Sequence, residues 1–66
     1  MDELKKALGA HDFGRASSLA WDGWITTHMG DPVHLAYSQV VDILFAGRTT
    51  DKDIKLCLEI LDNARS

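Results

Sequence analysis

The sequence predicts an all-α fold: a small compact bundle of four helices, one short and N-terminal and three of medium length, joined by tight turns. Apolar residues recur at spacings of three and four along most of the 66-residue chain, which is the period of a helix with one buried face. Glycine, proline and capping residues interrupt this pattern near residues 9–12, 30–31 and 47–50. These interruptions predict three breaks and therefore four helices.

The composition is typical of one domain that spans residues 1–66. Apolar residues make up 45% of the chain and charged residues 26%, which is ordinary for a globular domain, and the length is too small for two domains. No apolar run reaches the roughly 18 residues of a membrane span, and no signal peptide opens the sequence. We therefore expect a cytoplasmic protein without a membrane partner.

The first predicted helix covers residues 2–8 and is short. Its apolar residues share one face, and Gly9 is expected to end it. A helix of this length is unstable alone in water, so we expect it to pack against the rest of the chain. The residues of this face are Leu4, Ala7 and Leu8.

The second predicted helix covers residues 12–29 and begins with Asp12 as its N-cap. Gly14 and Gly23 each weaken a helix by about 1 kcal/mol relative to alanine. Burial of two tryptophans contributes more than the two glycines lose, so the helix is retained, and both tryptophans are expected in the core. The expected core face consists of Phe13, Ala16, Ala20, Trp21, Trp24, Ile25 and His28.

A helix boundary is predicted at Gly30, Asp31 and Pro32. Gly30 is suited to the left-handed conformation that follows a helix, Asp31 to an N-cap, and Pro32 to the first helical position. Two helices are therefore expected to meet here with almost no loop between them.

The third predicted helix runs from Pro32 to Ala46, and Gly47 follows it as the residue that ends it. Residues 40–45 would also suit a buried strand, but Asp42 interrupts this run and no second strand is available to pair with it. A helix is therefore favoured. Its expected core face consists of Val33, Ala36, Tyr37, Val40, Ile43 and Leu44.

The fourth predicted helix begins after Thr50. Thr50 and Asp53 stand three residues apart, as in a capping box. The single cysteine, Cys57, has no partner for an internal disulfide and lies on the expected core face, which predicts a buried structural thiol. This face consists of Ile54, Cys57, Leu58, Leu61 and Ala64.

Four Leu and Ile residues lie outside these core faces. Single exposed leucines are common on protein surfaces, but a second apolar surface is equally compatible with the pattern. Dimerisation is a frequent way for so short a chain to bury more surface, and two of the four residues stand one helical turn apart. The sequence therefore predicts a homodimer whose interface includes Leu56, Ile60, Leu35 and Leu19.

Few residues suggest catalysis or ligand binding. His28, Asp31 and His34 have side chains that bind metal ions, and they support an alternative reading as a metal-responsive module, although helix capping already explains Asp31. His11 and Asp12 have no third group to orient them as an acid–base pair. We expect no enzyme activity, no metal site and no cofactor.

The net charge of −3 argues against ordinary nucleic-acid binding. A helix-turn-helix regulator remains the first alternative, but such proteins need Lys and Arg to neutralise phosphate, and residues 31–46 contain neither. By elimination we expect a small acidic interaction module that regulates or inhibits a larger protein, as some phage- or mobile-element-encoded proteins do. Acidic residues expected to face that partner are Asp22, Asp42, Glu59 and Asp62.

Overall fold

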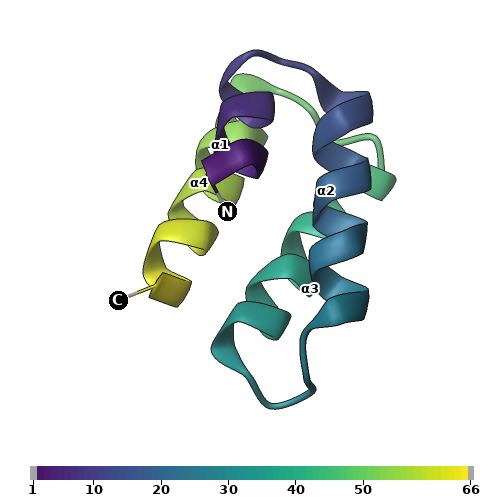
Figure 1. Cartoon of the computed structure of the whole chain (residues 1–66). Helices are drawn as coiled ribbons and strands as arrows, with labels where there is room; N and C mark the ends of the chain where they lie inside the picture. The colour runs from purple at the N-terminus through teal and green to yellow at the C-terminus, as the bar shows by residue number, and fades with distance from the viewer. Residues whose placement is uncertain (1, 66) are drawn as a thin grey trace.

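The computed structural model describes residues 2–65 and confirms the all-α fold. Four helices follow one another: α1 (Asp2–Gly9), α2 (Phe13–Thr26), α3 (Pro32–Phe45) and α4 (Asp51–Arg65). Helices α1 and α3 each pack against both α2 and α4, so the four form a closed ring (Figure 1). Within residues 2–65, no helix has both the length and the apolar character that crossing a membrane requires.

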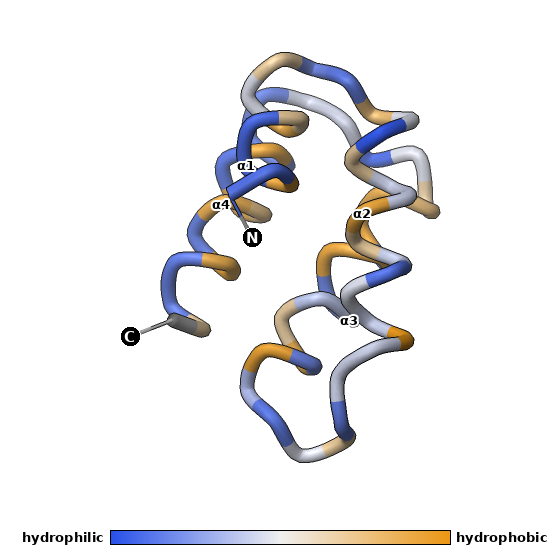
Figure 2. The backbone as a smooth tube through the Cα atoms, in the orientation of Figure 1, coloured by the Kyte–Doolittle hydropathy of each residue, from blue (hydrophilic) through white to orange (hydrophobic). Residues whose placement is uncertain are grey.

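The core receives side chains from all four helices. The faces predicted for α1 and α4 are confirmed, whereas α3 also buries Val41, which was not predicted, and leaves Val33 only half-buried. In α4 most hydrophobic positions turn toward the interior and hydrophilic ones face outward (Figure 2). Leu8, Val40, Cys57 and Leu61 are the largest side chains that are fully buried. The remaining buried residues are Leu4, Ala7, Ala16, Ala20, Ala36, Val41, Ile43, Leu44 and Ile54.

Helix α2 is rotated slightly relative to the prediction: Phe13, Ala16, Ala20 and Trp24 of the predicted face lie in or against the core, whereas Trp21, Ile25 and His28 are exposed. Trp21 and Ile25, which we expected in the core, are 42% and 58% exposed. Leu19, which was expected to point away, packs against the core. The buried positions of α2 are small, namely Ala16 and Ala20, because small side chains let a helix approach its neighbours closely. The larger side chains are displaced toward the edges of that contact.

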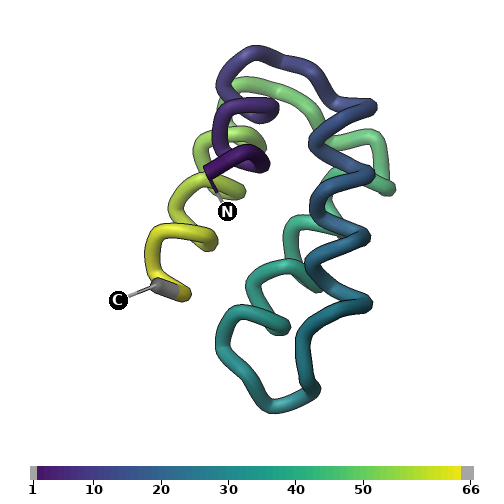
Figure 3. The backbone as a smooth tube through the Cα atoms, viewed as in Figure 1, coloured from purple at the N-terminus to yellow at the C-terminus, as the bar shows by residue number. Residues whose placement is uncertain are grey.

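The junction between α2 and α3 is longer than predicted. Helix α2 ends at Thr26 rather than Met29, and Thr27 is extended. The Thr27 hydroxyl lies 2.8 Å from the Gly23 carbonyl oxygen, to which it donates a hydrogen bond. A side chain that bonds the last turn in this way competes with continuation of the helix. The expected direct meeting of two helices is therefore wrong, and a wide loop joins them (Figure 3).

The start of α3 is formed as predicted. Asp31 is the N-cap, and its carboxylate accepts a hydrogen bond of 2.8 Å from the Val33 backbone N–H, with Pro32 in the first turn. Gly30 has a φ of 93°, but it does so within a turn closed by the Asp31 N–H and the His28 carbonyl oxygen, 3.1 Å apart. Gly30 therefore shapes the loop rather than ending α2.

The tightest junction lies between α1 and α2. The N–H groups of His11 and Asp12 donate to the carbonyl oxygens of Leu8 and Ala7 at 3.1 and 2.9 Å, the pattern of a Schellman motif. The left-handed residue is His11, with a φ of 58°, and not Gly9, although α1 does end at Gly9. Asp12 then caps α2 by accepting from the Arg15 N–H at 3.4 Å.

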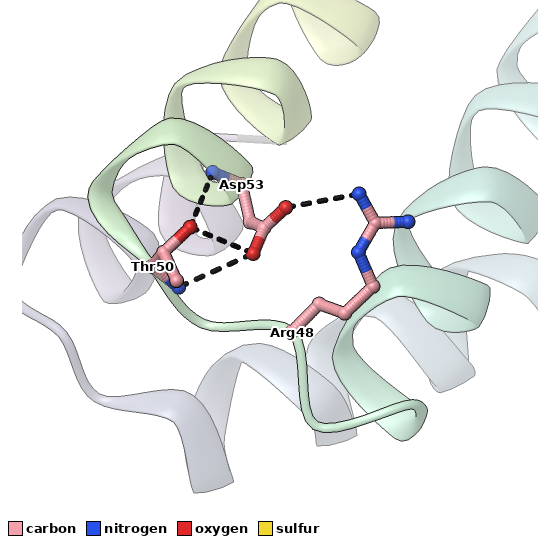
Figure 4. Close-up of polar contacts among 3 residues, drawn as sticks. All are labelled: Arg48, Thr50 and Asp53. Atoms are coloured by element: carbon pink, nitrogen blue, oxygen red, sulfur yellow. Dashed lines mark hydrogen bonds and ion pairs between the residues drawn. The ribbon is translucent and has the colours of Figure 1, made fainter.

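The C-terminal end of α3 and the N-terminal start of α4 follow the prediction. Gly47 has a φ of 76° and follows α3 in a second Schellman motif, since the Arg48 N–H donates to the Ile43 carbonyl oxygen at 3.1 Å. At the start of α4, the Asp53 N–H donates to the Thr50 hydroxyl oxygen at 3.2 Å, and the Thr50 N–H donates to the Asp53 carboxylate at 3.3 Å (Figure 4). The predicted capping box is confirmed.

Candidate interaction surfaces

The residues predicted to form a dimer interface occupy more than one environment. Leu35 and Leu56 are 60% and 40% exposed, whereas Ile60 and Leu19 are partly buried against the core. Leu35 of α3 and Ile60 of α4 line the same groove, which has a volume of about 260 Å³ and carries no charged side chain. We call this the α3–α4 groove, and its lining is Pro32, Leu35, Ala36, Gln39, Ile60, Asn63 and Ala64.

Leu56 lies in a different and strongly charged hollow on α4. Arg48, Lys52 and Lys55 surround it together with Asp53 and Glu59. The predicted ridge of Leu56 and Ile60 is thus divided between two surfaces. The hollow around Leu56 therefore combines three cationic side chains with two carboxylates, those of Asp53 and Glu59.

The capping box sets the electrostatics at one edge of this hollow. Asp53 accepts hydrogen bonds from the Thr50 hydroxyl at 2.7 Å and from the Arg48 guanidinium at 3.0 Å (Figure 4). The hydrogen bond from Thr50 is the main cause that lowers the pKa of Asp53 below its ordinary value of 3.8, and Arg48 adds to it. The carboxylate is therefore a fixed part of the helix start.

A second apolar surface, which the sequence analysis did not identify, follows the contact between α2 and α3. Four rings form a continuous series along it: Phe45 to Trp21, Trp21 to Trp24 and Trp24 to His34, with centroid separations of 5.8, 5.0 and 6.0 Å. Ile25 and Met29 extend the series toward the loop. We call this surface the aromatic strip, and its members are Trp21, Trp24, Ile25, Met29, His34 and Phe45.

The aromatic strip is accessible along most of its length. Phe45 is 60% exposed and Met29 is 89% exposed, while Trp24 is partly buried and packs against the core. Six large apolar side chains are exposed among the described residues, and four of them lie in this strip: Trp21, Ile25, Met29 and Phe45.

The strip was not predicted, because Trp21, Trp24 and Ile25 give α2 its most hydrophobic face and were expected in the core. The signal that identifies the true core face is the row of small residues at Ala16, Ala20 and Gly23, spaced four and three apart. A Cβ atom on Gly23 would overlap the Tyr37 ring, so α3 packs directly on this row. The tryptophans consequently lie beside the contact rather than within it.

The four acidic residues expected to face a partner are all exposed, but they are distributed over three helices. Asp22 lines a hollow of the aromatic strip with Trp21, and Glu59 lines the hollow around Leu56. Asp62 forms an ion pair with Lys5 of α1. Of the four, Asp22 is the one that shares a hollow with exposed aromatic rings, those of Trp21 and Phe45.

The residues considered for metal binding or catalysis have separate roles. Asp31 caps α3, and the Nδ1 atom of His34 lies 2.9 Å from the Thr27 hydroxyl oxygen. His28 is exposed in the loop. Across residues 2–65, no group of three or more His, Cys, Asp or Glu side chains is arranged to hold a metal ion.

Cys57 is fully buried, as predicted. Loss of contact with water is the main cause that raises the pKa of its thiol, and the negative charge of Asp53 acts in the same direction. A buried thiol with a raised pKa is a poor nucleophile, so the thiol is a structural part of the core.

Comparisons with known proteins add no relative to these observations. No protein-family model matches the chain, and neither the curated proteins nor the solved structures with which it was compared contain a significant match.

Proposed function

We propose that the chain is a protein–protein interaction module that regulates or inhibits a larger partner protein in the cytoplasm. The observation that carries this proposal is the aromatic strip, where Trp21, Ile25, Met29 and Phe45 are exposed together. Contiguous exposed apolar surface of this kind is typical of binding sites. Trp, Phe and Met are also enriched in protein interfaces, and Trp is prominent among the residues that contribute most to affinity.

Affinity capture from a lysate of cells that express the chain tests this proposal. We expect the wild-type chain to retain one partner in a defined ratio, and Ile25→Ser to reduce the amount retained. Leu56→Ser is the matched control, because it removes another exposed aliphatic side chain, 40% exposed against 58% for Ile25, that lies outside the strip. The proposal is contradicted if neither the wild-type chain nor either variant retains a partner in a defined ratio.

We also propose that the chain forms a homodimer through the α3–α4 groove. A two-fold axis repeats the same patch on both subunits, and a lining without charged side chains produces no repulsion between two copies. The exposed Leu35 of one copy would be buried against the groove of the other.

Light scattering coupled to gel filtration tests the homodimer. We expect a mass of twice 7.3 kDa for the wild type and a monomer for Leu35→Glu. A dimer that dissociates with Leu56→Glu but not with Leu35→Glu moves the interface to the outer face of α4. A wild-type monomer at high concentration rejects self-association.

A further inference from the structure

The aromatic strip is held in place before any partner binds. Trp21 contacts ring neighbours on two sides, Phe45 at 5.8 Å and Trp24 at 5.0 Å, and Trp24 is in turn stacked on His34 at an interplanar angle of 25°. Rings that are already ordered lose little conformational freedom on binding. The rings of the strip are therefore prearranged, and Ile25 and Met29 extend them as exposed side chains.

Two shallow hollows contain the tryptophans of the strip. The first has a volume of about 370 Å³ and is lined by Ser17, Ser18, Trp21, Asp22 and Phe45. The second has a volume of about 320 Å³ and is lined by Trp24, Ile25, Thr27, Met29 and His34. The Trp21–Trp24 pair separates them. Successive apolar side chains on one face of a helix fill hollows that follow one another along a groove in this way.

The charge of the strip is negative. Asp22 is the one Asp, Glu, Lys or Arg residue among those that line the two hollows. The sequence of α3 contains Asp42, three residues before Phe45, and no Lys or Arg, and α2 contains Arg15 near its start. A cation that approaches Asp22 also meets the Trp21 ring, and aromatic faces attract cations.

We infer that the aromatic strip binds a basic amphipathic helix of the partner, with apolar side chains one turn apart and Lys or Arg beside them. This inference rests on the proposed function and adds the chemistry of the partner. Charge complementarity selects this occupant. A second copy related by a two-fold axis at Trp21 would bring two Asp22 carboxylates together, and nucleic-acid phosphates would be repelled by the same residue.

Tryptophan fluorescence provides a direct test, because Trp21 and Trp24 are the two tryptophans of the chain. The probes are three helical peptides of roughly 18 residues without tryptophan: an amphipathic Leu/Ala/Lys peptide, its Leu/Ala/Glu analogue, and a scrambled Leu/Ala/Lys peptide. At about 0.15 M salt, where long-range attraction is screened, we expect the first to shift the emission. We expect about tenfold weaker binding of the other two, equivalent to about 1.4 kcal/mol.

Charge reversal separates a specific site from a general effect of net charge. Asp22→Lys should abolish the preference for the basic peptide over its acidic analogue. Glu59→Lys makes the same change in net charge in the hollow around Leu56 and should leave the preference intact. Circular dichroism checks that both variants are folded. Equal effects of the two substitutions, or equal binding of all three peptides, overturn the inference.

Other occupants of the strip give different results. Emission that changes with protein concentration alone assigns the strip to a second copy. Emission that shifts with phosphatidylcholine vesicles but not with peptides assigns it to a membrane surface. Either result overturns the inference about the basic helix. The proposed function fails separately, since that failure requires that no partner be captured from the lysate.

Discussion

Gly23 has the most restricted position of any glycine in the structure, because the Tyr37 ring of α3 occupies the space where a Cβ atom would lie. We predict that Gly23→Ala destabilises the fold by about 1–3 kcal/mol, as overpacking does, although alanine favours a helix by about 1 kcal/mol. Urea unfolding followed by circular dichroism measures this change.

Gly14 of the same helix provides the matched control. A Cβ atom there would have open space around it, so Gly14→Ala should stabilise the fold by up to about 1 kcal/mol. Stabilisation by both substitutions would show that α3 does not pack on Gly23 as closely as described.

His11 has a backbone conformation that side chains disfavour, with a φ of 58°. Comparison of His11→Gly with His11→Ala isolates this effect, because both lose the contact of the His11 ring with Phe13 and only glycine relieves the strain. We predict that the glycine variant is more stable than the alanine variant by about 1 kcal/mol. Equal unfolding midpoints would contradict the left-handed assignment.

At the scale of single residues, the sequence predicts structure well where the cause is local. Asp31, Gly47 and the pair Thr50–Asp53 act on backbone groups within a few positions of themselves, and the structure confirms each role. The conformation of His11 was not predicted, because Gly9 offered a less strained way to end α1. Which of the two residues adopts the left-handed conformation depends on the path of the chain into α2, and tertiary packing determines that path.

Among the elements, α4 should have an N-terminal turn whose contribution to stability depends on pH. The pKa of Asp53 is lowered in the fold, mainly by the Thr50 hydroxyl, so the unfolded chain binds the proton more readily. The stability that this carboxylate contributes is present above its ordinary pKa of 3.8 and is lost as the pH falls through the lowered value. Asp53→Asn should remove this part of the acid sensitivity.

The measurement is urea unfolding at about pH 6 and about pH 2.5, above and below the ordinary pKa of 3.8. The difference in unfolding free energy between wild type and Asp53→Asn should shrink on acidification. Thr50→Ala should lose part of this pH dependence. Thr26→Ala is the control, because the Thr26 hydroxyl donates to the Asp22 carbonyl oxygen, and this variant should retain the wild-type pH dependence. An identical pH dependence in wild type and Asp53→Asn would contradict the capping geometry.

The element that sequence reasoning described least well is α2. Its existence follows from the helical period, but its rotation does not, because two faces of α2 carry apolar residues. The face with Trp21 and Ile25 has the larger apolar area, while the face with Ala16 and Ala20 has the shape that permits close packing. Its end at Thr26 also depends on a hydroxyl that bonds the preceding turn, which spacing alone does not indicate.

On the scale of the whole molecule, the ring of helix contacts predicts that α1 is as necessary as α4. Leu8 and Leu61 are both fully buried, so replacement of either by alanine should destabilise the fold by about 2–5 kcal/mol. Lys55→Ala, at an exposed position of α4 outside both proposed interfaces, should change the stability by less than about 0.5 kcal/mol. Thermal unfolding by circular dichroism provides the comparison. A mild effect at Leu8 would mean that α1 detaches independently.

The candidate surfaces could be predicted from the sequence only in part. Leu35 and Ile60 were identified as surplus apolar residues, and the structure places them in one groove. The aromatic strip could not be foreseen, because Phe45 and Trp21 come from different helices and their contact exists only once α2 and α3 are packed.

The packing of α1 against α4 also affects how the chain acquires its fold during synthesis. Lys5 and Asp62 form an ion pair across 57 positions of sequence, and closing a segment of that length opposes folding with about 3.5 kcal/mol of chain entropy. A ribosome produces α1 long before it produces α4. Until α4 has been synthesised, α1 can pack only against α2. The contact between α1 and α4 can form only after Asp62 has left the exit tunnel of the ribosome.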